Sequence, residues 1–260
     1  MSKLKNAGIG FLLAWQFFSF VPIKKQLDMN KSSITWMYAN LPLVGLIIGA
    51  ILSSCAYLLV SYSDLSNVLV GILLVVGMIV FTGGLHVDGF IDLCDAFFSY
   101  GDKEKRLQVL DDPRTGAFGV LGVVVLILLK FGFIYEALEQ GRFEMLVFIA
   151  AVPYVARVGM LMYFVSMNTS KQTGLAAYFK GQVMTKQLIV TSVVMFALLS
   201  MGAVYIGLYS FFILVAIMLF AVVLYRNWSY RNFGGMSGDL LGALGESLEV
   251  VLWLVVLLCI

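Results

Sequence analysis

The sequence predicts an all-α, polytopic membrane protein, an integral bundle of about seven or eight transmembrane helices. Of its 260 residues, 61% are hydrophobic and 12% are charged, whereas soluble domains carry about 25% charged residues. Apolar runs of nearly 20 residues, the length that crosses a bilayer as a helix, recur along the chain. No polar segment between them is long enough to build its own core, so we expect residues 1–260 to form a single membrane-embedded domain.

Eight apolar segments are predicted to form helices. They span residues 6–22, 37–60, 68–82, 117–136, 145–165, 187–206, 210–226 and 240–259. Pro22 ends the first segment because proline cannot continue the hydrogen-bond ladder, and this segment is short enough either to cross the membrane or to lie partly in its interface. Pro42 starts or kinks the second segment. Gly45 and Gly49 in it have the GxxxG spacing that lets two helices approach closely.

The basic residues predict the orientation. Twelve of the 17 Lys and Arg residues fall on the side that carries the loop after the first helix and the polar stretch after the third. The opposite side holds Arg142, together with Lys3 and Lys5 if the first helix crosses fully. Cytoplasmic loops are enriched in Lys and Arg, so we expect a multi-pass protein of the cell membrane whose polar stretch faces the cytoplasm. We expect no nucleic-acid partner, and a homo-oligomer is left open.

Thr82–Gly119 is the stretch around which the chain is organised. It contains the only histidine, His86, and seven of the 15 acidic residues. At ~100° per residue, Asp88, Asp92 and Asp95 fall on one helical face. Three carboxylates on one face repel one another unless a cation lies between them, and Mg²⁺ takes oxygen ligands, usually together with substrate phosphates. The alternative is a solvated acidic face at the end of a membrane helix.

Three more polar segments are predicted on the same side. Residues 111–119 combine Arg114, a fork of donors suited to phosphate, with the start of a helix, although a plain turn and cap is the alternative. Residues 168–174 either cover phosphates or form a solvated connection. Residues 232–239 end on Asp239 at a helix start, and Glu246 follows on the same helix face, so we expect both acids to share a cavity with Asp88.

Two cations lie within apolar runs. We expect Lys130 to extend its ammonium to the membrane surface. Arg157 is predicted to pair either with a carboxylate or with a substrate phosphate. His86 is either a general base or a hydrogen-bonding residue at the helix entrance.

The order of these motifs resembles the cobalamin synthase family, the adenosylcobinamide-GDP ribazoletransferases. The matching segments are T-G-G-L-H-x-D-G-x-x-D-x-x-D from Thr82, G-D-K-E-K-R from Gly101 and D-x-R-x-G-x-F-G from Asp112. The resemblance extends over nearly the whole chain, ending in Gly234–Ala243, which is similar to the family's GGxTGDxLGA signature. Ala96, Pro113 and Ser237 depart from the family's usual residues, which affects loop geometry but removes no carboxylate.

The resemblance implies a magnesium-dependent transferase of the phosphotransferase type, in which manganese is an alternative metal. Such an enzyme joins adenosylcobinamide-GDP to α-ribazole or α-ribazole 5′-phosphate and releases GMP, a last step of the nucleotide loop pathway of cobalamin biosynthesis. It implies the following roles: metal ligands Asp88, Asp92 and Asp95; catalytic residues His86, Asp112 and Asp239; phosphate contacts Arg114, Arg157, Lys103 and Arg106.

Two other functions are compatible with the acidic residues. One is an enzyme resembling the CDP-alcohol phosphotransferases, which also place an aspartate cluster at the cytoplasmic ends of membrane helices; the missing D-G-x-x-A-R run disfavours it. The other is a cation or proton transporter using Asp88, Asp92, Glu246 and Glu249. Transporters place their acids at mid-membrane on interrupted helices, whereas most acids here are predicted at one membrane face.

Overall fold

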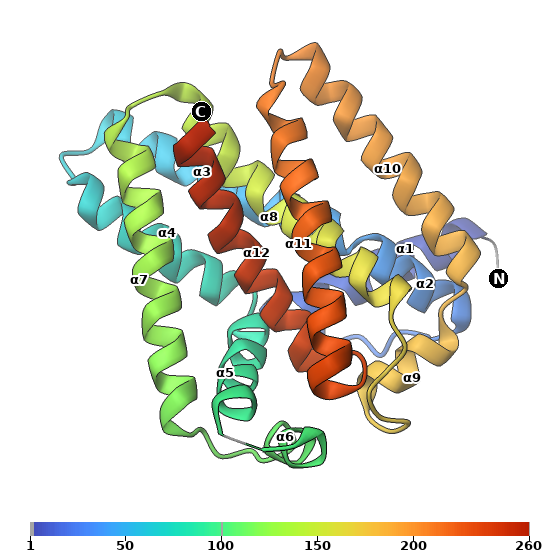
Figure 1. Cartoon of the computed structure of the whole chain (residues 1–260). Helices are drawn as coiled ribbons and strands as arrows, with labels where there is room; N and C mark the ends of the chain where they lie inside the picture. The colour runs from blue at the N-terminus through green and yellow to red at the C-terminus, as the bar shows by residue number, and fades with distance from the viewer. Residues whose placement is uncertain (1–2, 100, 260) are drawn as a thin grey trace.

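The computed structural model describes residues 3–99 and 101–259, which form twelve helices joined by loops (Figure 1). The predicted all-α class is confirmed. The helices are α1 Lys3–Phe18, α2 Lys31–Ala39, α3 Leu41–Tyr62, α4 Asn67–Phe81, α5 Leu85–Phe98, α6 Lys103–Val109, α7 Ala117–Glu139, α8 Phe143–Ser166, α9 Leu175–Gln182, α10 Thr185–Tyr205, α11 Ser210–Phe233 and α12 Gly238–Cys259.

Six helices are long and apolar enough to cross a membrane: α3, α7, α8, α10, α11 and α12. A seventh candidate is the pair formed by α4 and α5, which bends by 90° between its two halves and is either a broken span or a re-entrant segment. The segment predicted at 6–22 forms α1. With 16 residues, this helix is too short to be one of the candidate spans, and it packs against α2. The described residues therefore contain six or seven candidate spans, and seven is the lower end of the predicted range of seven or eight.

Helices α8 and α12 form the centre of the bundle. Helix α3 packs along α8, and α5 packs along the first half of α12; in Figure 1, α12 crosses the middle of the molecule between α7 and α11. Helix α8 carries apolar side chains on all of its faces, and most of its apolar segment is buried. A helix with apolar residues all round is typical of such a buried position.

The contact between α3 and α8 depends on glycine. A Cβ atom at Gly45 would lie 2.4 Å from the Cδ of Arg157, and one at Gly49 would lie 2.7 Å from the Cα of Ala150. Both distances are too short for any larger residue unless the helices move apart. The predicted close approach of this GxxxG segment to another helix is therefore confirmed.

Helix α11 extends beyond its apolar segment. The predicted end of α11 was residue 226, but the helix continues to Phe233 and stops at Gly234, whose φ of 79° is left-handed. Polar residues from Arg226 onward are still helical, so the end of the apolar run marks the membrane border and not the end of the helix. Gly234 ends it because glycine adopts this backbone conformation without steric cost.

Candidate active site

Two consecutive glycines direct α5 away from α4. Gly83 and Gly84 have φ values of 65° and 72°, a left-handed conformation that side chains with a Cβ disfavour. The Thr82 hydroxyl donates to the backbone oxygen of Met78 at 3.0 Å and closes the last turn of α4. The resulting 90° bend places the acidic helix α5 at one end of the bundle.

Glycine also brings α5 against the start of α12. A Cβ atom at Gly89 would lie 2.7 Å from the backbone oxygen of Asp239, and one at Gly242 would lie 3.1 Å from the Cα of His86. The two backbones are therefore in direct contact. This contact places Asp88 beside Asp239, although some 150 residues separate them in the sequence.

A cavity of about 410 Å³ opens where these segments meet. Its polar wall contains Asp88, Asp111, Asp239, Lys171 and Ser170. Its aromatic lining consists of Phe17, Phe18, Tyr38, Phe164 and Phe179. The rings of Tyr38 and Phe164 are stacked with centroids 3.9 Å apart. A cavity with one ionic and one aromatic wall suits a ligand that carries both negative charge and a flat ring.

The three aspartates of α5 occupy different environments. Asp88 is exposed, Asp92 is half-buried and Asp95 is buried. The charges of Asp88, Asp239 and Asp95 all act on Asp92, and no cation does so. Among the described residues, no three acidic, histidine or cysteine side chains converge closely enough to enclose a metal ion. The cluster is therefore an uncompensated group of carboxylates at the edge of the cavity.

Asp95 anchors the start of α7. Its carboxylate accepts hydrogen bonds from the backbone amides of Gly116 at 2.7 Å and Gly119 at 2.8 Å. A carboxylate at a helix N-terminus satisfies amides that have no partner within the helix and interacts favourably with the helix dipole. A Cβ atom at either glycine would lie 2.5 Å or less from an oxygen of Asp95. The glycines of this motif thus make room for Asp95, whereas the sequence predicted a phosphate site there.

The loop of residues 168–174 is firmly attached and is not a free connection. The Met236 amide donates to the oxygen of Asn168 and the Ser170 amide donates to the oxygen of Met236, both at 2.9 Å. Lys171 donates to the oxygen of Leu107 at 2.9 Å and forms an ion pair with Asp111. These bonds fix Lys171 in the cavity wall. Among the described residues it is the one Lys or Arg that lines this cavity, and the sequence indicated it only as part of its loop.

Asp112 and Arg114 form a pair outside the cavity. The Arg114 Nε donates to Asp112 at 2.8 Å, and the Arg114 side chain is 85% exposed. Hydrogen bonds from the Arg114 side chain lower the pKa of Asp112 to about 2. A carboxylate this acidic is a poor general base. Neither residue lines the cavity, so the structure does not bring this predicted base and this predicted phosphate ligand to the site.

Lys103 and Arg106 hold α6 against α11. The Lys103 ammonium lies 6.0 Å from the ring centre of Tyr230, and the Arg106 guanidinium lies 5.0 Å from the ring centre of Phe97. Arg106 also donates to the side chain of Asn232. Both predicted phosphate ligands therefore contact neighbouring helices and do not line the cavity.

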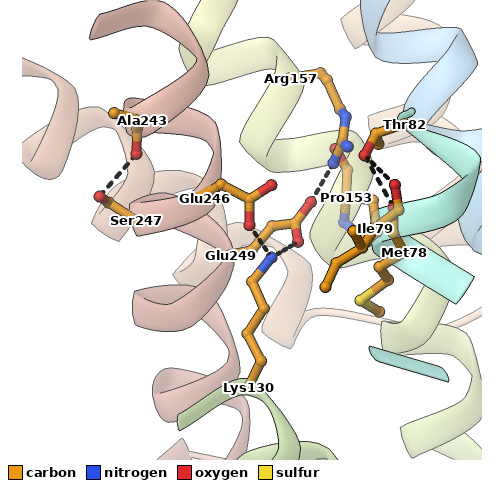
Figure 2. A network of polar contacts seen from close by, with 10 residues as sticks. All are labelled: Met78, Ile79, Thr82, Lys130, Pro153, Arg157, Ala243, Glu246, Ser247 and Glu249. Carbon is orange, nitrogen blue, oxygen red and sulfur yellow. Dashed lines mark hydrogen bonds and ion pairs between the residues drawn. The ribbon is translucent and has the colours of Figure 1, made fainter. Parts of the chain in front are cut away.

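Arg157 belongs to a buried network of ion pairs (Figure 2). It pairs with Glu249, while the Lys130 ammonium donates to Glu249 at 2.6 Å and also pairs with Glu246. All four side chains are at most 5% exposed. Two expectations are corrected: Lys130 does not extend to the membrane surface, and Glu246 does not share the cavity of Asp88. Asp239 does share it. Of the two partners predicted for Arg157, the structure shows the carboxylate and not the phosphate that the family resemblance implies.

His86 lies between this network and the cavity. Its side chain is only 3% exposed, yet it lines the cavity wall. Within residues 3–99 and 101–259, its Nδ1 has no hydrogen-bond partner. Buried polar atoms are almost always paired, so this unpaired ring nitrogen is an exception, and it belongs to a residue that also lines the cavity.

Comparison with known proteins gives consistent results. A family model described as cobalamin-5-phosphate synthase matches residues 10–257. Proteins named adenosylcobinamide-GDP ribazoletransferase from Geobacillus sp. (strain WCH70) and Geobacillus kaustophilus (strain HTA426) are 35% and 37% identical, covering 96% of this chain and 95% of each relative. A protein of the same name from Clostridium botulinum (strain Alaska E43 / Type E3) is 30% identical over 92% of this chain and 93% of its own. No solved structure matches.

Proposed function

This chain belongs to the cobalamin-5-phosphate synthase family, and we propose that the cavity between α5, α12 and residues 168–174 is its active site. The enzyme is a ribazoletransferase: it joins adenosylcobinamide-GDP to α-ribazole or α-ribazole 5′-phosphate and releases GMP. The observation that supports this assignment of the site is the meeting of Asp88, Asp239 and Lys171, from three distant polar segments, in one cavity wall.

The acidic cluster is the proposed magnesium site, with Mn²⁺ as an alternative. Asp88, Asp92 and Asp239 offer hard oxygen donors, and none of them forms an ion pair within the described residues. Mg²⁺ takes one or two such carboxylates together with substrate phosphates, so it does not require three converging side chains. We assign Asp239 to the metal in place of Asp95, because both Asp95 oxygens already accept amide hydrogen bonds. When bound, the metal would neutralise negative charge on the diphosphate and on the departing GMP.

The size of the cavity limits what enters it. A volume of about 410 Å³ accommodates a nucleoside-sized group but not a whole corrin ring. We place the flat base of the ribazole along the aromatic lining of the cavity, where Phe17 is a half-buried ring that can contact it. The diphosphate then lies along Asp88, Asp239 and Lys171, and the corrin remains outside the cavity.

The reaction requires little covalent participation from the protein. A ribazole hydroxyl attacks the phosphorus that carries cobinamide, the bond from that phosphorus to the GMP oxygen breaks, and the hydroxyl proton passes to a base. Positioning and charge neutralisation dominate such phosphoryl transfers. Lys171, held by Asp111, contacts the phosphate oxygens. His86 is the candidate base because it lines the cavity and is not assigned to the metal.

The transporter alternative is disfavoured by the ion pairs. Glu246 and Glu249, the acids at mid-helix in α12, are bound to Lys130 and Arg157 and are not free to carry an ion. The test of the proposed function is direct: the purified protein in detergent should release GMP from adenosylcobinamide-GDP only when α-ribazole and magnesium are both present. Release of GMP that does not require α-ribazole would contradict it.

We further propose that the active site faces the cytoplasm. With α1 outside the candidate spans, 14 of the 17 Lys and Arg residues fall on the side of the cavity and only Arg142 falls on the other. In a variant without Cys55, Cys94 and Cys259, single cysteines from Lys103→Cys and Lys171→Cys should react only after the membrane is opened. Arg142→Cys should react with an impermeant reagent in intact cells. Equal reactivity of positions 103 and 142 would contradict this orientation.

The structural role of Asp95 has its own expected result. Asp95→Asn keeps one acceptor oxygen but loses a charge-assisted bond to α7, so it should destabilise the protein by about 1–3 kcal/mol. The affinity of the Asp95→Asn protein for Mn²⁺, measured by electron paramagnetic resonance, should stay within about threefold of that of the unsubstituted protein. Asp88→Asn should show the reverse pattern, with weak Mn²⁺ binding and a nearly unchanged melting temperature. Loss of Mn²⁺ binding in a stable Asp95→Asn protein would return Asp95 to the metal site.

A further inference from the structure

An apolar cleft of about 450 Å³ runs along the membrane-spanning parts of α8, α10 and α11. Its α11 wall includes Val215 and Leu219, its α8 wall includes Met162, and its α10 wall includes Val193. The only polar residues that line it are serines and one tyrosine. Its lining therefore suits an apolar group from the surroundings.

The cleft is open toward the bilayer because α10 stands apart from α11. Helix α10 packs mainly against α2, and Figure 1 shows it at an angle to α11, the two helices meeting near the short loop that joins them. Val193 is 60% exposed and Met162 is 39% exposed, although both line the cleft. An acyl chain can therefore enter from the side without any helix moving.

A polar groove of about 420 Å³ follows at the end of α8 and α11. Arg226, Arg231 and Asn227 line it from α11, and Asn168 lines it from the loop after α8. It has no acidic residue in its lining, and neither arginine forms an ion pair within the described chain. Two exposed guanidinium groups without a carboxylate partner are suited to phosphate, which arginine binds through two parallel hydrogen bonds.

The cleft and the groove form one continuous surface. Ser166 lines both. At ~100° per residue, Arg226 lies on the same face of α11 as Val215 and Leu219. Arg226 follows Leu219 by seven residues, about 10 Å along the helix axis, which is comparable to the distance from a lipid phosphate to the first part of its acyl chains. The surface therefore combines an apolar slot within the membrane with two cations at its border.

We propose that this surface, defined by Arg226, Arg231, Ser166, Met162, Val193 and Leu219, binds one anionic phospholipid. The headgroup phosphate contacts the two arginines, and one acyl chain occupies the cleft beneath them. A soluble phosphate compound would leave the cleft empty, and an apolar helix of a second copy would leave the two arginines of the groove without an anionic partner. The site is separate from the active-site cavity and does not depend on the proposed reaction.

The experiment measures phospholipid binding to the delipidated protein in detergent by native mass spectrometry. Phosphatidylglycerol should bind one molecule per chain, and more tightly than phosphatidylcholine. The variant Arg226→Gln/Arg231→Gln should weaken phosphatidylglycerol binding at least about tenfold, since hydrogen bonds to charged groups are among the stronger ones. The control Lys24→Gln/Lys25→Gln removes the same charge from another exposed loop and should bind the lipid like the original protein.

A second pair of variants tests the acyl-chain part. Val193→Trp fills the cleft and should also weaken lipid binding at least about tenfold, whereas Val194→Trp places the same ring on the adjacent exposed position, which does not line the cleft. Thermal melts check that all variants are folded. Equal lipid binding by the two tryptophan variants, or unchanged binding after loss of both arginines, would overturn the proposal. So would displacement of the lipid by an equal concentration of sn-glycerol 3-phosphate, which would mark a site for free phosphate.

Discussion

Replacing Asp88 by asparagine is expected to lower the rate of GMP release by about 10³-fold or more. Asparagine keeps the size of the side chain but removes the charge that a divalent cation requires. Loss of metal-based charge stabilisation costs several kcal/mol in the transition state, and each 1.4 kcal/mol is tenfold in rate. The measurement is turnover of adenosylcobinamide-GDP by purified protein at saturating magnesium. Activity should also be lost in EDTA and return when Mg²⁺ or Mn²⁺ is added.

The matched control is Glu104→Gln, which removes an exposed acid from the same polar stretch. Its turnover should stay within about twofold of the original, because a charge on the solvent-exposed surface is screened by water and salt. Asp88→Asn should melt at or slightly above the original temperature, since one of several mutually repelling charges is gone. Turnover by Asp88→Asn that matches the Glu104→Gln control would leave the acidic helix as a solvated surface.

The spacing of the aspartates predicted their common helix but not their separate roles. Asp88, Asp92 and Asp95 do lie on α5, as their intervals require. From the sequence all three are equivalent acids on one face. What separates them is the helix packed against α5: α7 approaches Asp95 with two free amides, whereas α12 approaches Asp88 with a further carboxylate, Asp239. Neither contact is encoded in the spacing, because both partners come from distant parts of the chain.

The sequence does contain a signal for the buried network. Lys130 and Arg157 are single cations in apolar helices, and Glu246 and Glu249 lie one turn apart in a third apolar helix. Two cations and two anions at membrane depth cancel in charge, and charged groups at that depth are paired. Charge balance at membrane depth is therefore a signal in the sequence that favours a network of these four residues. Treating each charge separately wrongly assigns Lys130 to the membrane surface and Glu246 to the cavity, and it leaves Arg157 between a carboxylate and a phosphate.

The network joins the helices that hold the active site. Lys130 comes from α7, Arg157 from α8, and both glutamates from α12. Helix α5 packs against α7 and α12, and its own residues His86 and Asp88 line the cavity. The ion pairs therefore fix the two helices between which the acidic helix lies.

Breaking this network at one position is expected to destabilise the protein strongly. Lys130→Met leaves two buried carboxylates with only Arg157 as a partner, and removing one member of a buried ion pair costs about 3–5 kcal/mol. The double variant Lys130→Met/Glu246→Gln should recover more than half of this loss, because the remaining pair of Arg157 and Glu249 is neutral. The measurement is the free energy of unfolding in detergent micelles, obtained from denaturant titration of the helical signal.

The matched control is Ser247→Ala on the same helix. Ser247 is half-buried and bonds only to the backbone oxygen of Ala243 within α12, so its loss should change the free energy of unfolding by less than about 1 kcal/mol. A Lys130→Met protein as stable as this control would mean that the carboxylates are neutral without the lysine. A double variant no more stable than Lys130→Met would mean that lost packing of the lysine stem, and not the unpaired charge, causes the loss. Either result would contradict the view that charge balance at membrane depth holds α7, α8 and α12 around the acidic helix.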